Sequence, residues 1–328
     1  MSQDHPLVAI VGPTAAGKSE LAIELAEHLE GEVLNYDSVQ VYRGFDIGTG
    51  KVPLRERRDI AHHLLDVVEP GEVFTAGDFR IRALEVLAGI RARGKLPVVV
   101  GGTGLYLRAL LLGLFEGPTR SEELRGRLGA LAKRRGREFL HRLLARLDEK
   151  AGERIHARDT PKVIRALEVR LLAREPMSQM LERGRTGLTG FRVLKVGLRP
   201  DRKQLAHRIN ARVERMFAEG LLDETRRMLE RPDAAGIKPL GALGYRQACA
   251  VLRGEISREE GVRETQTATR RYAKRQMTWF RREPGVEWFE GFGDDPAVCL
   301  RALAWVRQAL TTSTDAPRAP GGEIPIGS

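Results

Sequence analysis

The sequence predicts an α/β protein in which helices flank a parallel sheet and an all-helical domain is inserted into the sheet domain. Two observations support this fold class. In the first hundred residues, short and uniformly apolar runs alternate with longer runs whose apolar residues recur every three or four positions. Such strands, alternating with helices, are typical of a parallel sheet covered on both faces. After residue 117 the composition becomes almost purely helix-forming, until a strand-like run returns at 191–198.

The expected elements follow one another along the chain. Strands are expected at 7–11, 32–36, 96–100 and 191–198. Helices are expected at 18–29, 77–93, 201–220, 221–230, 244–253 and 257–282. These elements assign 1–117 and 191–310 to one catalytic core and 118–190 to an inserted helical domain. The segment 311–328 is rich in Pro, Gly, Ser and Thr, and we expect it to be disordered.

Composition limits the class of protein. The chain has 328 residues, of which 42% are apolar, so most of it should be globular. Its N-terminus does not resemble a signal peptide, and its longest uncharged stretch near the middle is shorter than the roughly 20 residues that span a bilayer. Cys249 and Cys299 form no CxxC pair, which argues against zinc and for a reducing compartment. We therefore expect a soluble, cytoplasmic protein that acts as a monomer away from membranes.

The net charge of +11 is large for a metabolic enzyme of this size. A strongly basic domain is one indication of a nucleic-acid partner. A proteome that prefers arginine would explain the same number, so the charge alone leaves both interpretations open. The positions of the basic residues have to decide between them.

The octet GPTAAGKS fits the pattern GxxxxGK[ST] in full and lies between an expected strand and an expected helix. Its glycines allow backbone conformations that other residues disfavour, and its N–H groups can surround phosphate oxygens at a helix start. Lys18 brings a positive charge, and the Ser19 hydroxyl can ligate Mg²⁺. The core is therefore expected to be a P-loop NTPase-like sheet whose octet binds phosphate together with Mg²⁺. The alternative is that the octet is a glycine-rich turn without a ligand. The predicted phosphate ligands are Gly12, Pro13, Thr14, Ala15, Ala16, Gly17, Lys18 and Ser19.

The octet does not by itself indicate hydrolysis of a nucleotide. NTPases usually carry an apolar strand that ends in an Asp near the Mg²⁺ ion. Here the expected strand 96–100 leads into GGTG, with no Asp at that place. This pattern favours a diphosphate that acts as a leaving group.

Two further polar residues follow expected strands. Asp37 comes directly after the second strand, so it should face the same crevice as the octet. Taken alone, Asp37 is better explained as a helix N-cap. Thr103, in GGTG, leaves the third strand at the same sheet edge and could donate a hydrogen bond to a phosphate or a leaving oxygen. The alternative is that GGTG is a turn without a role in binding.

Two runs are rich in basic residues. Arg208, Arg212 and Arg215 share one helix face and could hold a diphosphate, although a solvated basic face would look the same. The run 263–282 carries a basic stripe that could lie along a phosphate backbone. Within it, Trp279 could stack on a base or belong to the core. The adjacent histidines in HHLLD diverge and are expected to be structural.

In this order, these segments resemble the tRNA dimethylallyltransferase (tRNA isopentenyltransferase) family, in its bacterial type. The resemblance covers residues 7 to about 290 and rests on GPTAAGKS, DSVQVYRGFDIGTGK, HHLLD, FTAGDF, PVVVGGTGLY, RVERMFAEGLLDE, ALGYRQ and AKRQMTWFR. Phe45 and Gly50 stand where Met and Ala are usual. The zinc finger of the eukaryotic members is absent.

The resemblance implies an enzyme that transfers a dimethylallyl group from dimethylallyl diphosphate to tRNA. The acceptor is the N6 amine of the adenosine 3′-adjacent to the anticodon, and diphosphate is released. In this family Asp37 corresponds to the base that takes the amine proton, which reverses the preference for a cap. Lys18 and Mg²⁺ on Ser19 would stabilise the leaving charge. Thr103 corresponds to a residue near the bridging oxygen, and Arg208 corresponds to a diphosphate ligand. Arg212 is a second candidate for a diphosphate ligand.

The resemblance also implies that the anticodon stem-loop enters between the core and the insertion. The residues that match tRNA-contacting segments are Asp37, Ser38, Val39, Gln40, Thr103, Pro161, Lys162, Val163, Ile164, Arg165, Gly244, Tyr245, Arg246, Gln247, Lys274, Arg275, Gln276, Thr278, Trp279 and Arg281. Two alternatives stay open: a P-loop small-molecule kinase, and a non-catalytic RNA-binding protein. The missing Asp after 96–100 and the basic run disfavour the first, and an intact Lys18, Ser19 and Asp37 disfavour the second.

Overall fold

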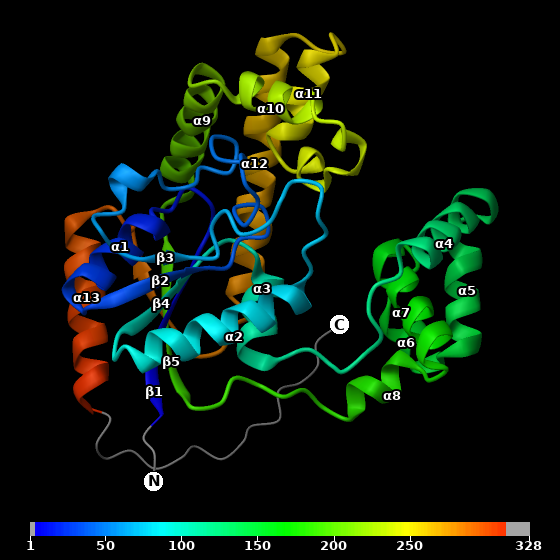
Figure 1. Cartoon of the computed structure of the whole chain (residues 1–328), viewed down its shortest axis with the longest axis horizontal. Helices are drawn as coiled ribbons and strands as arrows, with labels where there is room; N and C mark the ends of the chain where they lie inside the picture. The colour runs from blue at the N-terminus through cyan, green and yellow to red at the C-terminus, as the bar shows by residue number, and fades with distance from the viewer. Residues whose placement is uncertain (1–3, 313–328) are drawn as a thin grey trace. The chain divides into compact units, whose positions relative to one another are not determined.

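The computed structural model describes residues 4–312, which divide into two units (Figure 1). One unit contains 4–111 and 188–312, and the other contains 112–187. The expected insertion, 118–190, begins six residues after the start of the second unit and ends three residues beyond its end. The chain leaves the first unit where α3 (Gly104–Leu112) ends. The Leu188 N–H donates to the Leu111 carbonyl at 3.0 Å, so the segments that enter and leave the insertion are hydrogen-bonded to each other. Most of the segment 311–328, for which disorder is expected, lies outside the described residues.

The first unit is built on a six-stranded sheet of order β3-β2-β4-β1-β5-β6, in which every pairing is parallel. The predicted parallel α/β core is therefore confirmed. Its strands are β1 (His5–Val11), β2 (Gly31–Asn35), β3 (His62–His63), β4 (Leu96–Val100), β5 (Phe191–Arg199) and β6 (Val286–Glu290). The edge strands β3 and β6 were not expected, because β3 has only two residues and β6 is a five-residue run that mixes charged with aromatic side chains.

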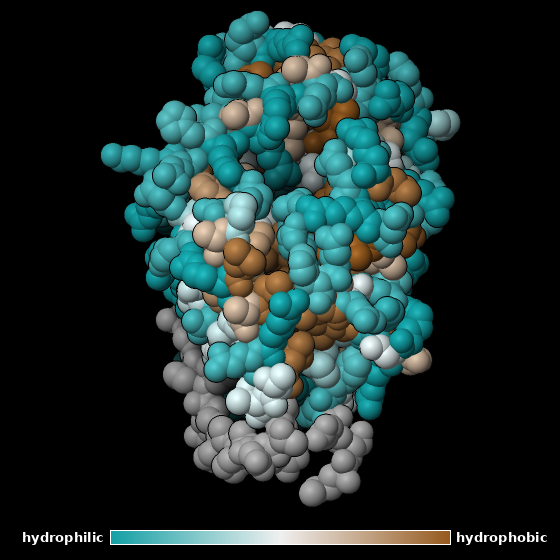
Figure 2. Space-filling model, turned by 90° about the vertical axis from the view of Figure 1, so that its left-hand side faces the viewer, coloured by the Kyte–Doolittle hydropathy of each residue, from teal (hydrophilic) through white to brown (hydrophobic). Residues whose placement is uncertain are grey.

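Helices cover both faces of this sheet. The central strand β1 sends Val8 and Ile10 to a core formed with α1 (Lys18–His28) and α13 (Pro296–Thr311). Its alternate residues Leu7 and Ala9 enter a second core with α2 (Ala76–Ala92) and α3. The face that carries α1 and α13 is largely hydrophilic, with scattered apolar residues (Figure 2). Burial on both faces explains why the sequence of β1 is uniformly apolar.

Four more helices form a layer beyond the carboxyl ends of the strands. They are α9 (Arg202–Ala218), α10 (Leu221–Leu229), α11 (Tyr245–Leu252) and α12 (Arg258–Phe280). Phe217 and Tyr245 from this layer pack with Val41 and Phe45, which belong to the long connection after β2. Three short 3-10 helices complete the unit: η1 (Leu54–Glu56), η2 (Ala234–Gly236) and η3 (Lys238–Gly241). This layer packs against the loops that follow the strands.

The second unit is all-helical. It contains α4 (Glu122–Arg135), α5 (Arg137–Leu147), α6 (Glu149–Arg154), α7 (Thr160–Ala173) and α8 (Met177–Glu182). Glu168 is fully buried among these helices and accepts hydrogen bonds from Ser121 N, Arg125 and Arg165 at 2.8, 3.1 and 2.7 Å. Burial alone raises the pKa of Glu168, but the bonds from Arg165 and Ser121 outweigh it and hold that pKa below its ordinary value.

The adjacent histidines take part in the sheet edge. His63 contacts Glu32 at 2.6 Å, and Arg93 donates to the same carboxylate at 2.8 and 2.7 Å. The Arg93 hydrogen bond is the main reason why the pKa of Glu32 falls to about 2. Among residues 4–312, no helix is long and apolar enough to cross a membrane.

Candidate active site

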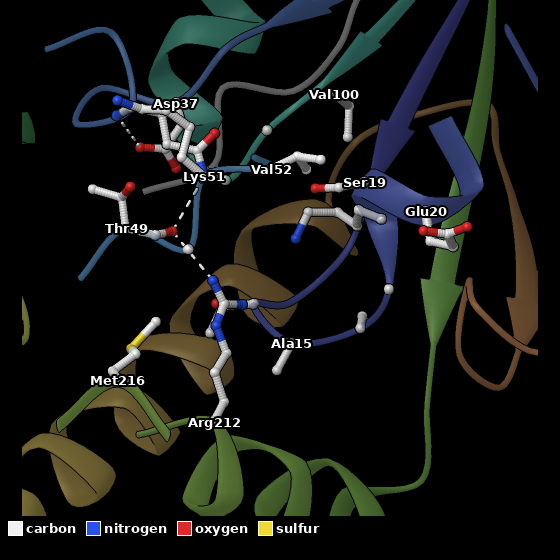
Figure 3. A pocket seen from close by; sticks show the side chains of 18 of the residues that line it. Ala15, Ser19, Glu20, Asp37, Thr49, Lys51, Val52, Val100, Arg212 and Met216 are labelled. Atoms are coloured by element: carbon white, nitrogen blue, oxygen red, sulfur yellow. Dashed lines mark hydrogen bonds between the residues drawn. The ribbon is translucent and has the colours of Figure 1, made fainter. Parts of the chain in front are cut away.

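A cavity of about 1020 Å³ lies at the carboxyl ends of β1, β2 and β4 (Figure 3). Because these strands are parallel, the loops that follow them meet at one edge of the sheet. The octet follows β1, Asp37 follows β2, and the Gly101–Gly102 pair follows β4. Arg208 and Arg212 reach the same cavity from α9. The whole lining comes from the first unit.

The backbone of the octet depends on its glycines. Gly17 has φ +79°, and a side-chain carbon there would lie 2.7 Å from the backbone nitrogen of Asp294. Gly12 has φ +148°, and a side-chain carbon there would lie 3.0 Å from the Leu198 carbonyl oxygen. Ala15 also occupies the left-handed region, at φ +63°, which is rare for a residue with a side chain. The loop is therefore closely packed and locally strained.

Lys18 folds back over the octet. Its ammonium donates to the Pro13 carbonyl at 2.8 Å. Burial, and next to it the positive charge of Arg212, lower the pKa of Lys18 to about 7, although the Asp37 carboxylate opposes this shift. The ammonium thus lacks an anionic partner strong enough to offset its burial. A diphosphate in the cavity would supply one.

Ser19 is the second residue of α1 and lines the cavity (Figure 3). Among residues 4–312, its hydroxyl has no hydrogen-bonding partner. Mg²⁺ prefers hard oxygen donors, and in phosphate sites it takes few of them from the protein and the rest from water and phosphate. The Ser19 hydroxyl and the Asp37 carboxylate are donors of that kind on one cavity, so the residues fit the ion.

A second group of possible metal ligands lies outside the cavity. Among residues 4–312, the His, Cys, Asp and Glu side chains close enough to share an ion are Glu24, Glu27 and His28 on α1. Arg58 already donates to Glu24 and Glu27, at 2.5 and 3.0 Å. These acids are therefore neutralised by an arginine.

The two oxygens of the Asp37 carboxylate have different surroundings. Oδ1 accepts from the backbone N–H groups of Val39 and Gln40 at 2.9 and 3.3 Å, so Asp37 does cap the chain, although it caps a turn and not a helix. Oδ2 lies opposite Gly102, where a side-chain carbon would come within 3.1 Å of it. Oδ1 therefore holds the turn, whereas Oδ2 accepts no hydrogen bond from residues 4–312.

Thr103 is placed differently from the expectation. Its hydroxyl accepts from the Ser38 N–H at 3.0 Å and donates to the Ser38 hydroxyl at 3.1 Å. Thr103 does not line the cavity, whereas Gly101 and Gly102 do. The hydroxyl therefore joins the loop after β4 to the turn after β2, and so holds the turn that carries Asp37.

Arg208 lies against the loop that precedes α13. Its guanidinium donates to both Asp294 oxygens at 2.6 and 2.7 Å and stacks over the Phe292 ring at 3.9 Å. Gly293 in the same loop donates to the Ala16 carbonyl at 2.8 Å. Arg208 is thus held beside the octet by an acid that competes with any bound anion.

Arg212 lies deeper in the cavity and donates to the Thr49 carbonyl at 3.2 Å (Figure 3). Burial lowers its pKa, and the Asp37 charge opposes this. A side-chain carbon at Gly50 would lie 1.7 Å from the Arg212 guanidinium. In this position Arg212 therefore depends on a glycine at 50.

The residues that match tRNA-contacting segments divide into exposed and buried groups. Exposed side chains belong to Pro161, Lys162, Arg246, Lys274, Arg275, Thr278, Trp279 and Arg281. Half-exposed positions are Asp37, Ser38, Val39, Gln40, Thr103, Ile164 and Arg165. Buried positions are Val163, Gly244, Tyr245, Gln247 and Gln276. The exposed basic residues of α12 share one helix with the buried Gln276.

The buried side chains differ from the expectation of direct contact with tRNA. Val163 belongs to the core of the second unit. Tyr245 donates to Glu224 at 2.5 Å, and Gln247 accepts from the Gly244 N–H at 3.1 Å. Motifs mark whole segments, whereas neighbouring residues of a helix face opposite sides. These side chains therefore support the surface from inside.

Two charged residues near the cavity have no counterpart among the expected site residues. Lys51 is buried, and its ammonium contacts Asp46 and Asp66, each at 2.6 Å. Glu224 is buried on α10 and accepts three backbone N–H bonds from 46–48, at 2.9 to 3.2 Å. Its spacing from the apolar Leu221 could have indicated burial, but no local signal shows what it binds.

Comparisons with known proteins agree with one another. The family model described as IPP transferase matches residues 40–283, and the one described as Isopentenyl transferase matches residues 5–66. A tRNA dimethylallyltransferase of Koribacter versatilis is 53% identical and one of Solibacter usitatus is 54% identical, each over 93% of this chain and 99% of the relative.

Solved structures give the same result. The full-length tRNA isopentenylpyrophosphate transferase of Bacillus halodurans has a TM-score of 0.70 at 37% identity, over 94% of this chain and 98% of that one. A eukaryotic dimethylallyltransferase acting on tRNA has a TM-score of 0.80 at 26% identity, over 94% of this chain and 80% of that one.

Proposed function

This chain belongs to the tRNA dimethylallyltransferase family, and from that membership we propose that it transfers a dimethylallyl group from dimethylallyl diphosphate to tRNA. The acceptor is the N6 amine of the adenosine on the 3′ side of the anticodon. The bond between the dimethylallyl C1 and the diphosphate oxygen breaks, and a bond between C1 and N6 forms. The amine loses one proton, and diphosphate leaves.

The observation that carries this proposal is the shared cavity of the octet and Asp37. The N6 lone pair is delocalised into the adenine ring, so a base has to take the proton as the new bond forms. Oδ2 of Asp37 is the oxygen that is free for this role. The octet, with Lys18, receives the diphosphate, where positive charge stabilises the leaving group. Mg²⁺, held by Ser19 and the diphosphate, would add Lewis-acid neutralisation of that charge.

The end of β4 supports a leaving group over a hydrolysed nucleotide. β4 ends at Val100 and is followed by two glycines, where an NTPase would carry an acid for its metal. Arg208 and Arg212 lie on the side of the cavity formed by α9 and add positive charge there. We assign Arg208 as a diphosphate ligand that exchanges its bonds to Asp294 for bonds to the diphosphate.

The RNA contacts are proposed for the exposed basic residues of α12. Lys274, Arg275 and Arg281 are exposed, and Trp279 is 36% exposed with the Arg108 guanidinium 4.3 Å from its ring. Such a surface suits a phosphate backbone with unstacked bases. The target adenosine has to leave its stack in order to reach the cavity, at a cost of a few kcal/mol.

A product assay tests the proposed function. Purified protein is incubated with unmodified tRNA, Mg²⁺ and dimethylallyl diphosphate, and the digested tRNA is examined by mass spectrometry. We expect N6-dimethylallyladenosine only when all components are present. Consumption of ATP with no such nucleoside across a full tRNA pool would instead indicate a kinase.

A further inference from the structure

Gln276 joins the octet to the loop after β4 through one buried amide. Its Oε1 accepts from the Thr14 backbone N–H at 2.8 Å, and its Nε2 donates to the Gly102 carbonyl at 2.8 Å. The side chain is 5% exposed. The partners fix the orientation of the amide, because an N–H needs an acceptor and a carbonyl needs a donor. Each polar atom of Gln276 thus has a backbone partner within the protein.

The bond to Thr14 lies beside the strained part of the octet. Ala15, the next residue, has φ +63°, a conformation that costs roughly 1–2 kcal/mol for a residue with a side chain. Strained residues persist only where their surroundings hold them. The turn from Pro13 to Ala16 has one long internal bond, from Ala16 N to the Pro13 carbonyl at 3.3 Å. An anchor at Thr14 is therefore well placed to hold the loop open for an anion.

The helix that carries Gln276 also carries the exposed basic surface. Tyr272, one turn earlier, donates to the same Gly102 carbonyl at 3.2 Å. A side-chain carbon at Gly102 would meet Gln276 Nε2 at 2.8 Å and Asp37 Oδ2 at 3.1 Å, so the glycine lets α12 approach the acid. One face of α12 is thus fastened to the octet, while Lys274 and Arg275 lie on the exposed side.

We propose that Gln276 is a positioning residue that holds the octet in its diphosphate-binding conformation from the helix that faces the RNA. This inference rests on the proposed function, because it takes diphosphate as the ligand of the octet. It gives Gln276 a role inside the protein beside the predicted contact with tRNA. Without the amide, the Thr14 N–H loses its partner and the strained turn loses its anchor.

The test compares Gln276→Met with two variants on the same helix. Methionine keeps the length and volume of the side chain but removes both hydrogen bonds. Tyr272→Phe keeps the ring and removes the hydroxyl that donates to the Gly102 carbonyl. Thr269→Val removes a hydroxyl bonded to Thr265 within the helix and serves as the matched control for a buried change in α12. The readouts are the Kd for inorganic diphosphate with Mg²⁺, by titration calorimetry, and the Kd for tRNA.

We expect Gln276→Met to raise the diphosphate Kd roughly tenfold, as for an unpaired buried donor, with the tRNA Kd within twofold of wild type. Thr269→Val should leave both values within twofold of wild type. If Gln276→Met does not fold, Gln276→Asn, whose amide is one methylene too short to reach both partners, gives the same readout.

Three results would overturn the inference. They are an unchanged diphosphate Kd in a folded Gln276 variant, a loss confined to tRNA binding, or an equal loss of diphosphate affinity in Tyr272→Phe, which would place the effect at Gly102. The wild-type product assay runs in parallel. Product from wild type with an unchanged diphosphate Kd in the variant rejects only this inference, whereas absence of product rejects the proposed function.

Discussion

Asp37 shows how one side chain can satisfy two interpretations of a motif. As an N-cap it would be structural, and as a base it would be catalytic. Its Oδ1 holds the turn through Val39 and Gln40, and its Oδ2 is left facing Gly102. The cap fixes the carboxylate in place, because two backbone N–H bonds leave it little rotational freedom. The structural and proposed catalytic roles therefore support each other.

Asp37→Asn should separate these two roles. Asparagine keeps an oxygen for the turn but cannot take a proton, so we expect single-turnover transfer to slow by roughly 10²–10⁴. The tRNA Kd should stay within about twofold, since the turn is kept. The control is Asp201→Asn, because Asp201 Oδ1 also accepts two backbone N–H bonds, both at 3.0 Å, but lies outside the cavity. A wild-type rate in Asp37→Asn would exclude Asp37 as the base.

Lys18 predicts a pH dependence of diphosphate binding. Because burial lowers its pKa to about 7, most Lys18 is neutral in the free protein at pH 8. A bound diphosphate favours the ammonium, so binding above pH 7 should take up close to one proton, and affinity should fall by up to about tenfold per pH unit. Titration calorimetry in buffers of different ionisation enthalpy measures the uptake. Lys18→Met is the control, and equal uptake in that variant would contradict the assignment.

The lowered pKa of Lys18 makes the free energy of unfolding depend on pH with the opposite sign from a lysine in a salt bridge, whose pKa is raised. Between pH 7 and the ordinary lysine pKa of 10.5, the unfolded chain binds more protons at Lys18 than the folded chain does. The contribution of Lys18 to the free energy of unfolding therefore rises with pH across this range. At neutral pH, Lys18 therefore contributes less to the free energy of unfolding than it does near pH 10.

At the scale of elements, helices hold the loops that line the cavity. α10 holds 46–48 through Glu224, α12 holds the octet and Gly102 through Gln276, and the loop before α13 packs on Ala16 through Gly293. In each case a helix or its flanking loop supplies the polar group, and a loop supplies backbone donors or acceptors. The loops that line the cavity are therefore held by polar groups from the surrounding helices and their flanking loops.

Glu224→Gln tests this support at the element scale. An amide offers one acceptor oxygen in place of two and turns its NH₂ toward backbone donors. We expect the free energy of unfolding to fall by about 1–3 kcal/mol in denaturant titrations. Tyr245→Phe removes only one of the bonds to Glu224 and should cost about 1 kcal/mol. If Glu224→Gln were as stable as wild type, the buried carboxylate would not be holding 46–48.

At the scale of the whole molecule, the net charge of +11 predicts a strong salt dependence of tRNA binding. Each phosphate neutralised by Lys or Arg adds about one unit to the slope of log K against log salt. Lys274→Ala should therefore lower that slope by about one and leave the diphosphate Kd unchanged. The control is Lys150→Ala, which removes the same charge from a lysine paired with Glu182 at 2.7 Å. An equal change of slope in both variants would argue against a specific contact at α12.

Local pattern determined much of this protein. The expected strand 96–100 is β4, and the helices expected near 18–29, 201–220 and 257–282 are α1, α9 and α12, each within a few residues. The octet, through the spacing of its glycines, lysine and serine, indicates a phosphate site from sequence alone. Periodicity and motif spacing are properties of neighbouring residues, so they can be read from one stretch of chain.

Only the tertiary structure decided which side chains meet. Thr14 and Gln276 are 262 residues apart, and Ser38 and Thr103 are 65 apart. Gln276 stands three residues after Ala273 and four before Phe280, so helical spacing could have indicated that it is buried. No local signal shows that its amide binds Thr14 and Gly102. Likewise, the two-residue strand β3 forms because β2 offers it hydrogen bonds, and only the pairing of β6 with β5 shows that this short run joins the sheet. Contacts of this kind depend on the folded backbone, since the partners come together only when the sheet and its loops are in place.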